Sequence, residues 1–69
     1  MSKIKITLNG EEFFCEKQES LLHLVQNLGL DIKKIAVEKN YQIADSENLG
    51  NEFLQENDKV EIVYFIGGG

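Results

Sequence analysis

The sequence lacks proline and tryptophan, and it contains a single cysteine, Cys15. One cysteine excludes an internal disulfide, and secreted domains of this size usually carry several. No apolar stretch approaches the roughly 18 residues of a membrane-spanning helix, and the start MSKIKITLNG has no apolar segment typical of a signal peptide. These absences predict a cytoplasmic protein without a membrane segment.

Positive charge is also scarce. The chain has 7 Lys and Arg against 12 Asp and Glu, which gives a formal net charge of -5. Nucleic acids and anionic membranes are bound mainly through Lys and Arg, so the composition argues against both as partners. Acidic residues gather toward the end of the chain, where Lys59 is the lone cation: Asp45, Glu47, Glu52, Glu56, Asp58 and Glu61. They form either a solubilising face or a surface that steers the chain toward a basic partner.

The residue patterns of a self-contained enzyme are missing. No Cys and His cluster has the spacing of zinc ligands, and no glycine-rich phosphate loop precedes a helix. Cys15 points inward on a predicted strand, where a free cysteine usually acts as a small hydrophobe. His23 falls on the polar face of a predicted helix and is expected to face water. We therefore expect no catalysis, no metal site and no bound cofactor.

Alternating apolar and polar residues predict a β-hairpin at the start of the chain, in KIKITLNGEEFFCEK. The pair Asn9-Gly10 lies between the two strands, and both residues tolerate the positive φ that a two-residue turn requires. On the second strand, the flanking glutamates place Phe13 and Cys15 inside and Phe14 on the wetter face. The inward residues of the first strand are Ile4, Ile6 and Leu8.

The next segment, SLLHLVQNLG, predicts a helix. Ser20 suits the N-cap, where its hydroxyl accepts a hydrogen bond from an N–H of the first turn. Gly29 suits the left-handed position that follows a helix end. Gln26 and Asn27 share the polar face with His23. The apolar stripe has the spacing of one helix face and consists of Leu21, Leu24, Val25 and Leu28.

Residues 33–45 predict two short strands joined by a turn at Asn40-Tyr41, with Ile35 and Val37 on one face. Residues 46–59 show no clear period and are expected to be irregular or to form a short helical turn. A tight turn follows in which Asn57 takes a left-handed conformation. The expected apolar anchors of this irregular segment are Leu49, Phe53 and Leu54.

The last strand is predicted in KVEIVYFI, and its nearly continuous apolar character favours a central position in a sheet. If Glu61 faces outward, Val63 and Phe65 share its face. The alternative is that another element covers both residues, since single exposed apolar residues are normal. The inward residues of this strand are then Val60, Ile62 and Tyr64.

The order of these elements is hairpin, helix, strands, irregular segment and final strand. One helix against a mixed sheet of four to five strands is an α+β architecture. A hairpin whose helix crosses over to further strands is typical of a β-grasp fold. We expect residues 1–69 to form a single domain, with residues 67–69 as an exposed C-terminal tail.

The tail itself is the most unusual feature, because three glycines, Gly67, Gly68 and Gly69, follow a strand directly. They are either a frayed end or the part that the protein offers to partners. Three extended residues reach about 10 Å, and without side chains they can thread a narrow channel. The α-carboxylate of Gly69 is ionised at neutral pH and is a poor electrophile. Acyl chemistry at this carboxylate therefore needs prior activation, for instance as an acyl-adenylate.

These segments resemble the ThiS family of sulfur carrier proteins, which are ubiquitin-like β-grasp proteins of thiamin thiazole synthesis. The likeness covers nearly the whole chain. ITLNGEEFFCEKQESLLHLVQNLGL looks like the family's opening hairpin and capped helix, and IAVEKNYQIAD is similar to its middle hairpin. LQENDKVEIVYF resembles the turn and strand before the tail. The terminal Gly-Gly is the most specific element, although all ubiquitin-like sulfur carriers and modifiers share it.

The resemblance implies a cycle carried out by partner enzymes. A ubiquitin-activating-like adenylyltransferase (ThiF-like) uses ATP and Mg²⁺ to adenylate the carboxylate of Gly69. A sulfurtransferase system fed by a cysteine desulfurase converts it to a thiocarboxylate, and thiazole synthase (ThiG-like) takes the sulfur. Gly68 and Gly69 carry over as functional residues, with Gly67 as an extension. Val63, Phe65 and Glu61, just before the tail, are expected to form a docking patch.

Two other functions remain compatible with these residues. A sulfur carrier could serve another product, such as molybdopterin or an amino acid. A ubiquitin-like modifier could instead form isopeptide bonds between Gly69 and lysines of other proteins. The acceptor enzyme that binds the chain distinguishes the first alternative, and conjugates of higher mass distinguish the second.

Overall fold

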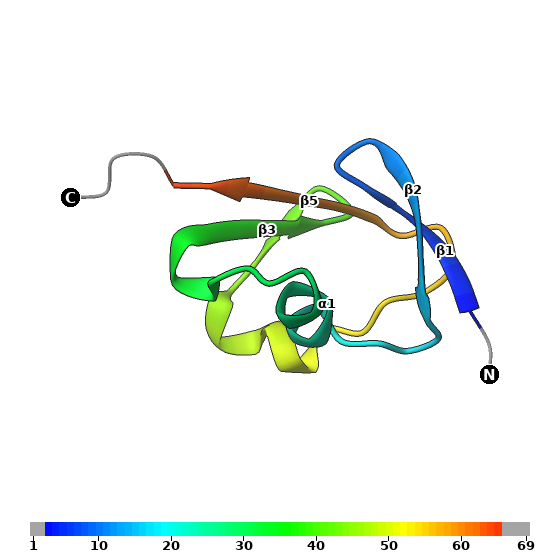
Figure 1. Ribbon diagram of the computed structural model, residues 1–69, viewed down its shortest axis with the longest axis horizontal. Coiled ribbons are helices and arrows are strands. Elements are labelled where there is room, and N and C mark those ends of the chain that lie inside the picture. The colour runs from blue at the N-terminus through cyan, green and yellow to red at the C-terminus, as the bar shows by residue number, and fades with distance from the viewer. Residues whose placement is uncertain (1–2, 66–69) are drawn as a thin grey trace.

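The computed structural model of the chain describes residues 3–65, and residues 1–2 and 66–69 lie outside this description. Figure 1 shows the helix α1 packed against one face of a sheet with strand order β2-β1-β5-β3-β4. The sheet is mixed, because β5 pairs in parallel with β1 and antiparallel with β3. The elements in chain order are β1 (Lys3–Leu8), β2 (Glu11–Glu16), α1 (Leu21–Asn27), the 3₁₀ helix η1 (Ile32–Lys34), β3 (Ile35–Lys39), β4 (Gln42–Ala44), the 3₁₀ helix η2 (Ser46–Asn51) and β5 (Lys59–Tyr64). The predicted α+β architecture is confirmed.

The opening hairpin forms as predicted. Asn9 and Gly10 close it with φ angles of 51° and 83°, the left-handed pair that a two-residue turn requires. On β2, Cys15 is buried, Phe13 is half-buried and Phe14 is exposed. The alternation of the sequence therefore predicts the faces of this strand correctly.

The helix α1 is capped at both predicted ends. The Ser20 hydroxyl accepts a hydrogen bond from the N–H of His23 at 3.0 Å, and Gly29 takes a φ of 75° after the helix. Leu28 was predicted in the apolar stripe, but its side chain is 37% exposed. Leu28 is the C-cap residue and lies past the turns that pack on the sheet. The buried face consists of Leu21, Leu24 and Val25.

The middle of the chain forms the predicted pair of short strands, β3 and β4. Asn40 and Tyr41 connect them with φ angles of 53° and 71°, so this turn has the same left-handed character as the first. Ile35 and Val37 face the core, as their spacing predicts. The short helix η1 was not anticipated. Its start is capped by Asp31, whose carboxylate accepts from the Lys33 N–H at 2.9 Å.

The predicted irregular segment holds η2 and an extended loop that returns to β5. Leu49 and Leu54 are buried as predicted, and Asn57 takes the expected left-handed conformation with φ of 72°. The prediction for Phe53 is wrong, because its side chain is 50% exposed. Successive residues of an extended segment point to opposite sides, so the burial of Leu54 turns Phe53 outward.

Strand β5 lies at the centre of the sheet, as predicted. Val60 and Ile62 face the core beneath the sheet, where α1 packs (Figure 1). Tyr64 was also predicted to face the core, but 59% of its side chain is exposed. It pairs with Ile35, the first residue of β3, at the end of the sheet. Tyr64 therefore lies on the predicted side of the strand but past the part of the core that would cover it.

Candidate functional site

The second half of β5 carries an exposed apolar patch on the outer face of the sheet, the face away from α1. Val63 and Phe65 are 56% and 60% exposed, which confirms their predicted exposure and excludes a covering element within residues 3–65. The strand register adds two residues to the same face. Ala36 lies opposite Val63 on β3, and Ile43 on β4 is 74% exposed. We call these four residues the outer-face patch.

Two carboxylates border the outer-face patch. Glu61 lies directly opposite Glu38 in the pairing of β5 with β3. Like charges opposite each other on neighbouring strands are destabilising, and neither residue forms an ion pair within residues 3–65. The sheet therefore presents unbalanced negative charge next to its exposed apolar residues. This arrangement suits a partner surface that offers a cation beside an apolar contact.

The chain is held in the sheet up to the edge of the described structure. The N–H of Phe65 donates to the carbonyl of Lys34 at 2.9 Å, one residue past the end of β5. A surface hollow of about 360 Å³ lies beside Phe65, and Ile32 and Leu49 are among the residues that line it. The backbone is therefore fixed to the end of the sheet at Phe65, and the last four residues of the chain follow from there.

The residues of the predicted tail, Gly67, Gly68 and Gly69, lie outside the described residues. Their predicted roles stay predictions. What the structure does place is the anchor from which they start, Phe65, four residues before the C-terminus. Four extended residues span about 13–14 Å.

Two acidic residues of the last third make contacts within the fold. Glu52 lies 3.0 Å from the Lys39 ammonium. Asp58 accepts hydrogen bonds from the Gln55 N–H at 2.9 Å and the Asn40 amide at 3.0 Å. These two carboxylates therefore hold local structure. Glu61 differs, because it faces outward beside the apolar patch and opposite Glu38.

Lys59, the lone cation of this region, is itself engaged. Its ammonium donates to the Tyr41 hydroxyl at 2.8 Å and lies 4.8 Å from the centroid of the same ring. The hydrogen bond to Tyr41 is the largest cause of a raised pKa of Lys59, and the charge of Glu61 adds a smaller effect. Lys59 is therefore charged at neutral pH, but its ammonium is bound to Tyr41 and forms no ion pair with Glu61 within residues 3–65.

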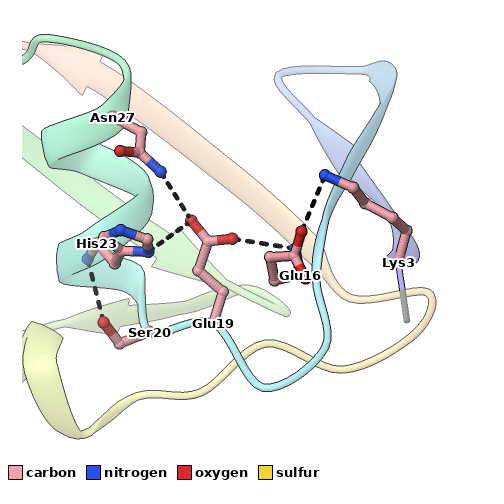
Figure 2. A network of polar contacts seen from close by, with 6 residues as sticks. All are labelled: Lys3, Glu16, Glu19, Ser20, His23 and Asn27. Carbon is pink, nitrogen blue, oxygen red and sulfur yellow. Dashed lines mark hydrogen bonds and ion pairs between the residues drawn. The ribbon is translucent and has the colours of Figure 1, made fainter. Parts of the chain in front are cut away.

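A second polar cluster joins β2 to α1, and sequence reasoning missed its central residue (Figure 2). The side chain of Glu19 is only 5% exposed, and its carboxylate lies 3.1 Å from Nδ1 of His23. It also accepts hydrogen bonds from the Glu16 N–H at 3.0 Å and the Asn27 amide at 3.3 Å. His23 remains largely exposed, so its predicted contact with water holds while its partner was not foreseen. The spacing of Glu19 and His23, one helical turn, was the available signal.

Cys15 lies near this cluster and behaves as the predicted buried hydrophobe. Its side chain is 4% exposed. Burial raises the pKa of the thiol, and the nearby charge of Glu19 raises it further. Thiolate chemistry is therefore disfavoured at this position. No group of three or more His, Cys, Asp or Glu within residues 3–65 is placed to hold a metal ion, and no helix of this part of the chain is long and apolar enough to cross a membrane.

Comparison with known proteins agrees with this geometry. The chain is 32% identical over 65 residues to the sulfur carrier protein ThiS of Bacillus subtilis, and the match covers 93% of this chain and 98% of that protein. The crystal structure of the thiamine biosynthesis protein ThiS from Geobacter metallireducens superposes with a TM-score of 0.84 at 25% identity, and it covers 96% of this chain and 100% of that one. This structural match confirms the predicted β-grasp fold.

The chain also resembles part of much longer proteins. It is 42% identical over 66 residues to a thiazole synthase of Magnetococcus marinus and 38% identical to one of Paramagnetospirillum magneticum. Each match covers 96% of this chain but only 20% of the thiazole synthase. The chain thus spans about a fifth of the length of these relatives. Because residues 6–69 match the ThiS family, this chain belongs to that family.

Proposed function

We propose that this chain is a sulfur carrier of thiamin biosynthesis that acts through the carboxylate of Gly69 and is itself no catalyst. Membership of the ThiS family carries the proposal. The structure is compatible with it, because β5 ends in a fixed anchor at Phe65 and the outer-face patch lies beside that anchor. The folded domain then serves as a handle that partner enzymes recognise, while the last residues carry the chemistry.

In the proposed cycle, a ubiquitin-activating-like adenylyltransferase joins the Gly69 carboxylate to AMP and releases pyrophosphate from ATP, with Mg²⁺ as its cofactor. A persulfide of the cysteine desulfurase and sulfurtransferase system then displaces AMP, and a thiol of that system reduces the acyl disulfide so formed, which leaves a thiocarboxylate at Gly69 and a disulfide on the donor. This order follows from the chemistry of a carboxylate, which resists nucleophiles until a good leaving group is attached. Glycine at the end leaves the acyl carbon unhindered.

Thiazole synthase is the proposed sulfur acceptor. In two thiazole synthases, a segment similar to nearly all of this chain belongs to the same polypeptide as the rest of the enzyme. Covalent linkage raises the effective concentration of two modules that work together. A separate carrier of the same family must reach the same contact by docking. This fusion favours thiazole synthase over an acceptor from another pathway.

The outer-face patch with Glu61 is the proposed docking surface for these partners. Val63 and Phe65 supply apolar area that loses contact with water on binding. Glu61 and Glu38 repel each other, and a basic residue of the partner would reduce this repulsion. A partner cation therefore gains more binding energy from the two facing carboxylates than it would from a single surface carboxylate. The recognised partner surface should therefore be apolar with a Lys or Arg at its border.

The decisive test compares the full chain with a variant lacking Gly69 in an adenylation assay with the cognate activating enzyme. The full chain should consume ATP and, with the sulfur source added, gain the mass of one oxygen replaced by one sulfur. The shortened chain should do neither. If the full chain never gains this mass with sulfur in excess, the proposed function is wrong. Conjugates that survive reducing gels would instead identify a protein modifier.

A further inference from the structure

The central strand β5 has two edges that are occupied very differently. Along one edge, β5 is paired with β3 as far as Tyr64, and the Phe65 N–H donates to the carbonyl of Lys34 beyond that point. Along the other edge, β1 pairs only from Lys59 to Val60. Strand β1 ends at Leu8, and the hairpin turns away from β5 there (Figure 1). On the β1 side, the last part of β5 is therefore left without a neighbouring strand.

Asn9 marks the point where this second edge opens. Its backbone N–H donates to the carbonyl of Val60 at 2.9 Å, and its side-chain oxygen accepts from the N–H of Ile62 at 2.8 Å. The side chain of Asn9 thus stands in for the next residue of β1 and satisfies one more backbone group of β5. Beyond it, no strand continues along this side within residues 3–65.

The backbone groups left at this edge follow from the alternation of a strand. The Phe65 N–H points to β3, and the Ile62 N–H points to the opposite side, toward Asn9. Neighbouring residues direct their groups to opposite edges, so the N–H and carbonyl of Tyr64 point the same way as those of Ile62. The carbonyl of Ile62 and both groups of Tyr64 have no backbone partner within residues 3–65. We call these three groups the open edge.

We propose that an extended segment of thiazole synthase adds to the open edge as a further strand when that enzyme takes the tail of this chain. The inference rests on the function proposed above. Gly69 lies four residues after Phe65, so an enzyme that receives it must lie within about 13–14 Å of this edge. Unpaired strand edges are templates for added strands. Here the unpaired edge lies immediately before the residues that lead to Gly69.

The side chains at the open edge fit an added strand. Tyr64 is 59% exposed on the inner side, whereas Val63 and Phe65 are exposed on the outer side. Cross-strand pairs of aromatic or branched residues stabilise adjacent strands, so an added strand covers apolar area on both faces. A second copy of this chain is a poor occupant. Each copy carries a formal net charge of -5, so two copies repel each other at this edge.

The test removes one donor of the open edge without touching any side chain. Total chemical synthesis of the full chain allows the amide between Val63 and Tyr64 to be replaced by an ester, which deletes the Tyr64 N–H. The matched control is an ester at Phe14 on the outer edge of β2. Phe14 lies opposite Lys5 in a pair whose N–H groups point away from the partner strand, so the control loses an equivalent solvent-facing donor.

Affinity for the cognate thiazole synthase is then measured by calorimetry for the unmodified chain and both esters. The Tyr64 ester should bind about three- to tenfold more weakly, the loss expected for one backbone hydrogen bond. The Phe14 ester should bind like the unmodified chain. If the Tyr64 ester also binds unchanged, the added strand is refuted while the carrier function stands. If the unmodified chain neither binds the enzyme nor forms a thiocarboxylate, the proposed function fails and this inference fails with it.

Amide hydrogen exchange supplies an independent measurement. On binding thiazole synthase, exchange at the Tyr64 amide should slow at least about tenfold, while exchange at the outward amide of Phe14 stays the same. Exchange at Tyr64 that slows with rising concentration of the chain alone would show a second copy at the edge and would overturn the proposal. Unchanged exchange at Tyr64 in the complex would overturn it as well.

Discussion

The carboxylate of Glu19 lies 3.1 Å from Nδ1 of His23, and this pair fixes the junction between β2 and α1 (Figure 2). A carboxylate only accepts hydrogen bonds, so Nδ1 of His23 carries the proton. The Glu16 N–H and the Asn27 amide complete three donors around one buried side chain. A buried carboxylate is costly unless such partners surround it. Glu19 therefore ties the end of the hairpin to two successive turns of the helix.

Replacing Glu19→Gln should destabilise the fold although the shape hardly changes. A glutamine side chain accepts at one oxygen only, so its amide nitrogen faces a donor unless His23 changes tautomer and Asn27 turns its amide. The expected loss in free energy of unfolding is about 1–3 kcal/mol, measured by urea denaturation. The control is Glu16→Gln, because the Glu16 side chain forms only an exposed ion pair with Lys3. That control should cost less than about 1 kcal/mol. Equal stabilities of the two variants would contradict the central role of Glu19.

Two substitutions of Asn9 separate its two contributions. Asn9→Gly keeps the positive φ of 51° without strain but loses the hydrogen bond to Ile62. We expect it to lower the free energy of unfolding by about 1 kcal/mol. Asn9→Ala loses the same bond and also strains a left-handed position, which adds about 1 kcal/mol or more. Thermal and urea unfolding of both variants measure this difference. If the two variants are equally stable, the backbone conformation of this turn contributes nothing.

The sequence predicts best those features that depend on neighbouring residues. The left-handed conformations of Asn9 and Asn57 follow from residue type alone, and both are found. At Asn40 the turn was predicted, but its left-handed conformation was not. The central position of β5 follows from its apolar character. The exposure of Val63 and Phe65 follows from alternation around Glu61.

Features that depend on distant parts of the chain could not be predicted in this way. Glu19 is buried because donors from two elements converge on it. The exposure of Tyr64 depends on where the core ends beneath the sheet, which no local period encodes. Glu38 and Glu61 lie opposite each other because of the register between β3 and β5. The exposed apolar residues of the outer face were therefore predicted only along β5, and those on β3 and β4 came from the structure.

The raised pKa of Cys15 gives the protein a defined stability loss at alkaline pH. Because the folded state holds the thiol proton more tightly, the stabilisation by the neutral thiol is complete below the ordinary value of 9.0. It is lost as the pH rises through the raised value. The difference in free energy of unfolding between the native chain and Cys15→Ala should therefore shrink above pH 9.0. A difference that stays constant across this range would show that Cys15 does not titrate differently in the folded state.

Truncating the exposed side chains of Val63 and Phe65 should impair partner recognition while leaving the fold intact. Val63 and Phe65 are more than half exposed, so Val63→Ala and Phe65→Ala should each change the free energy of unfolding by less than about 0.5 kcal/mol. Each should lower kcat/KM of adenylation by the cognate activating enzyme about tenfold, as for residues at the centre of an interface. Phe14→Ala is the matched control, because Phe14 is 59% exposed on the same face of the sheet but two strands away. Equal kcat/KM values for all three variants would show that the activating enzyme recognises the tail alone.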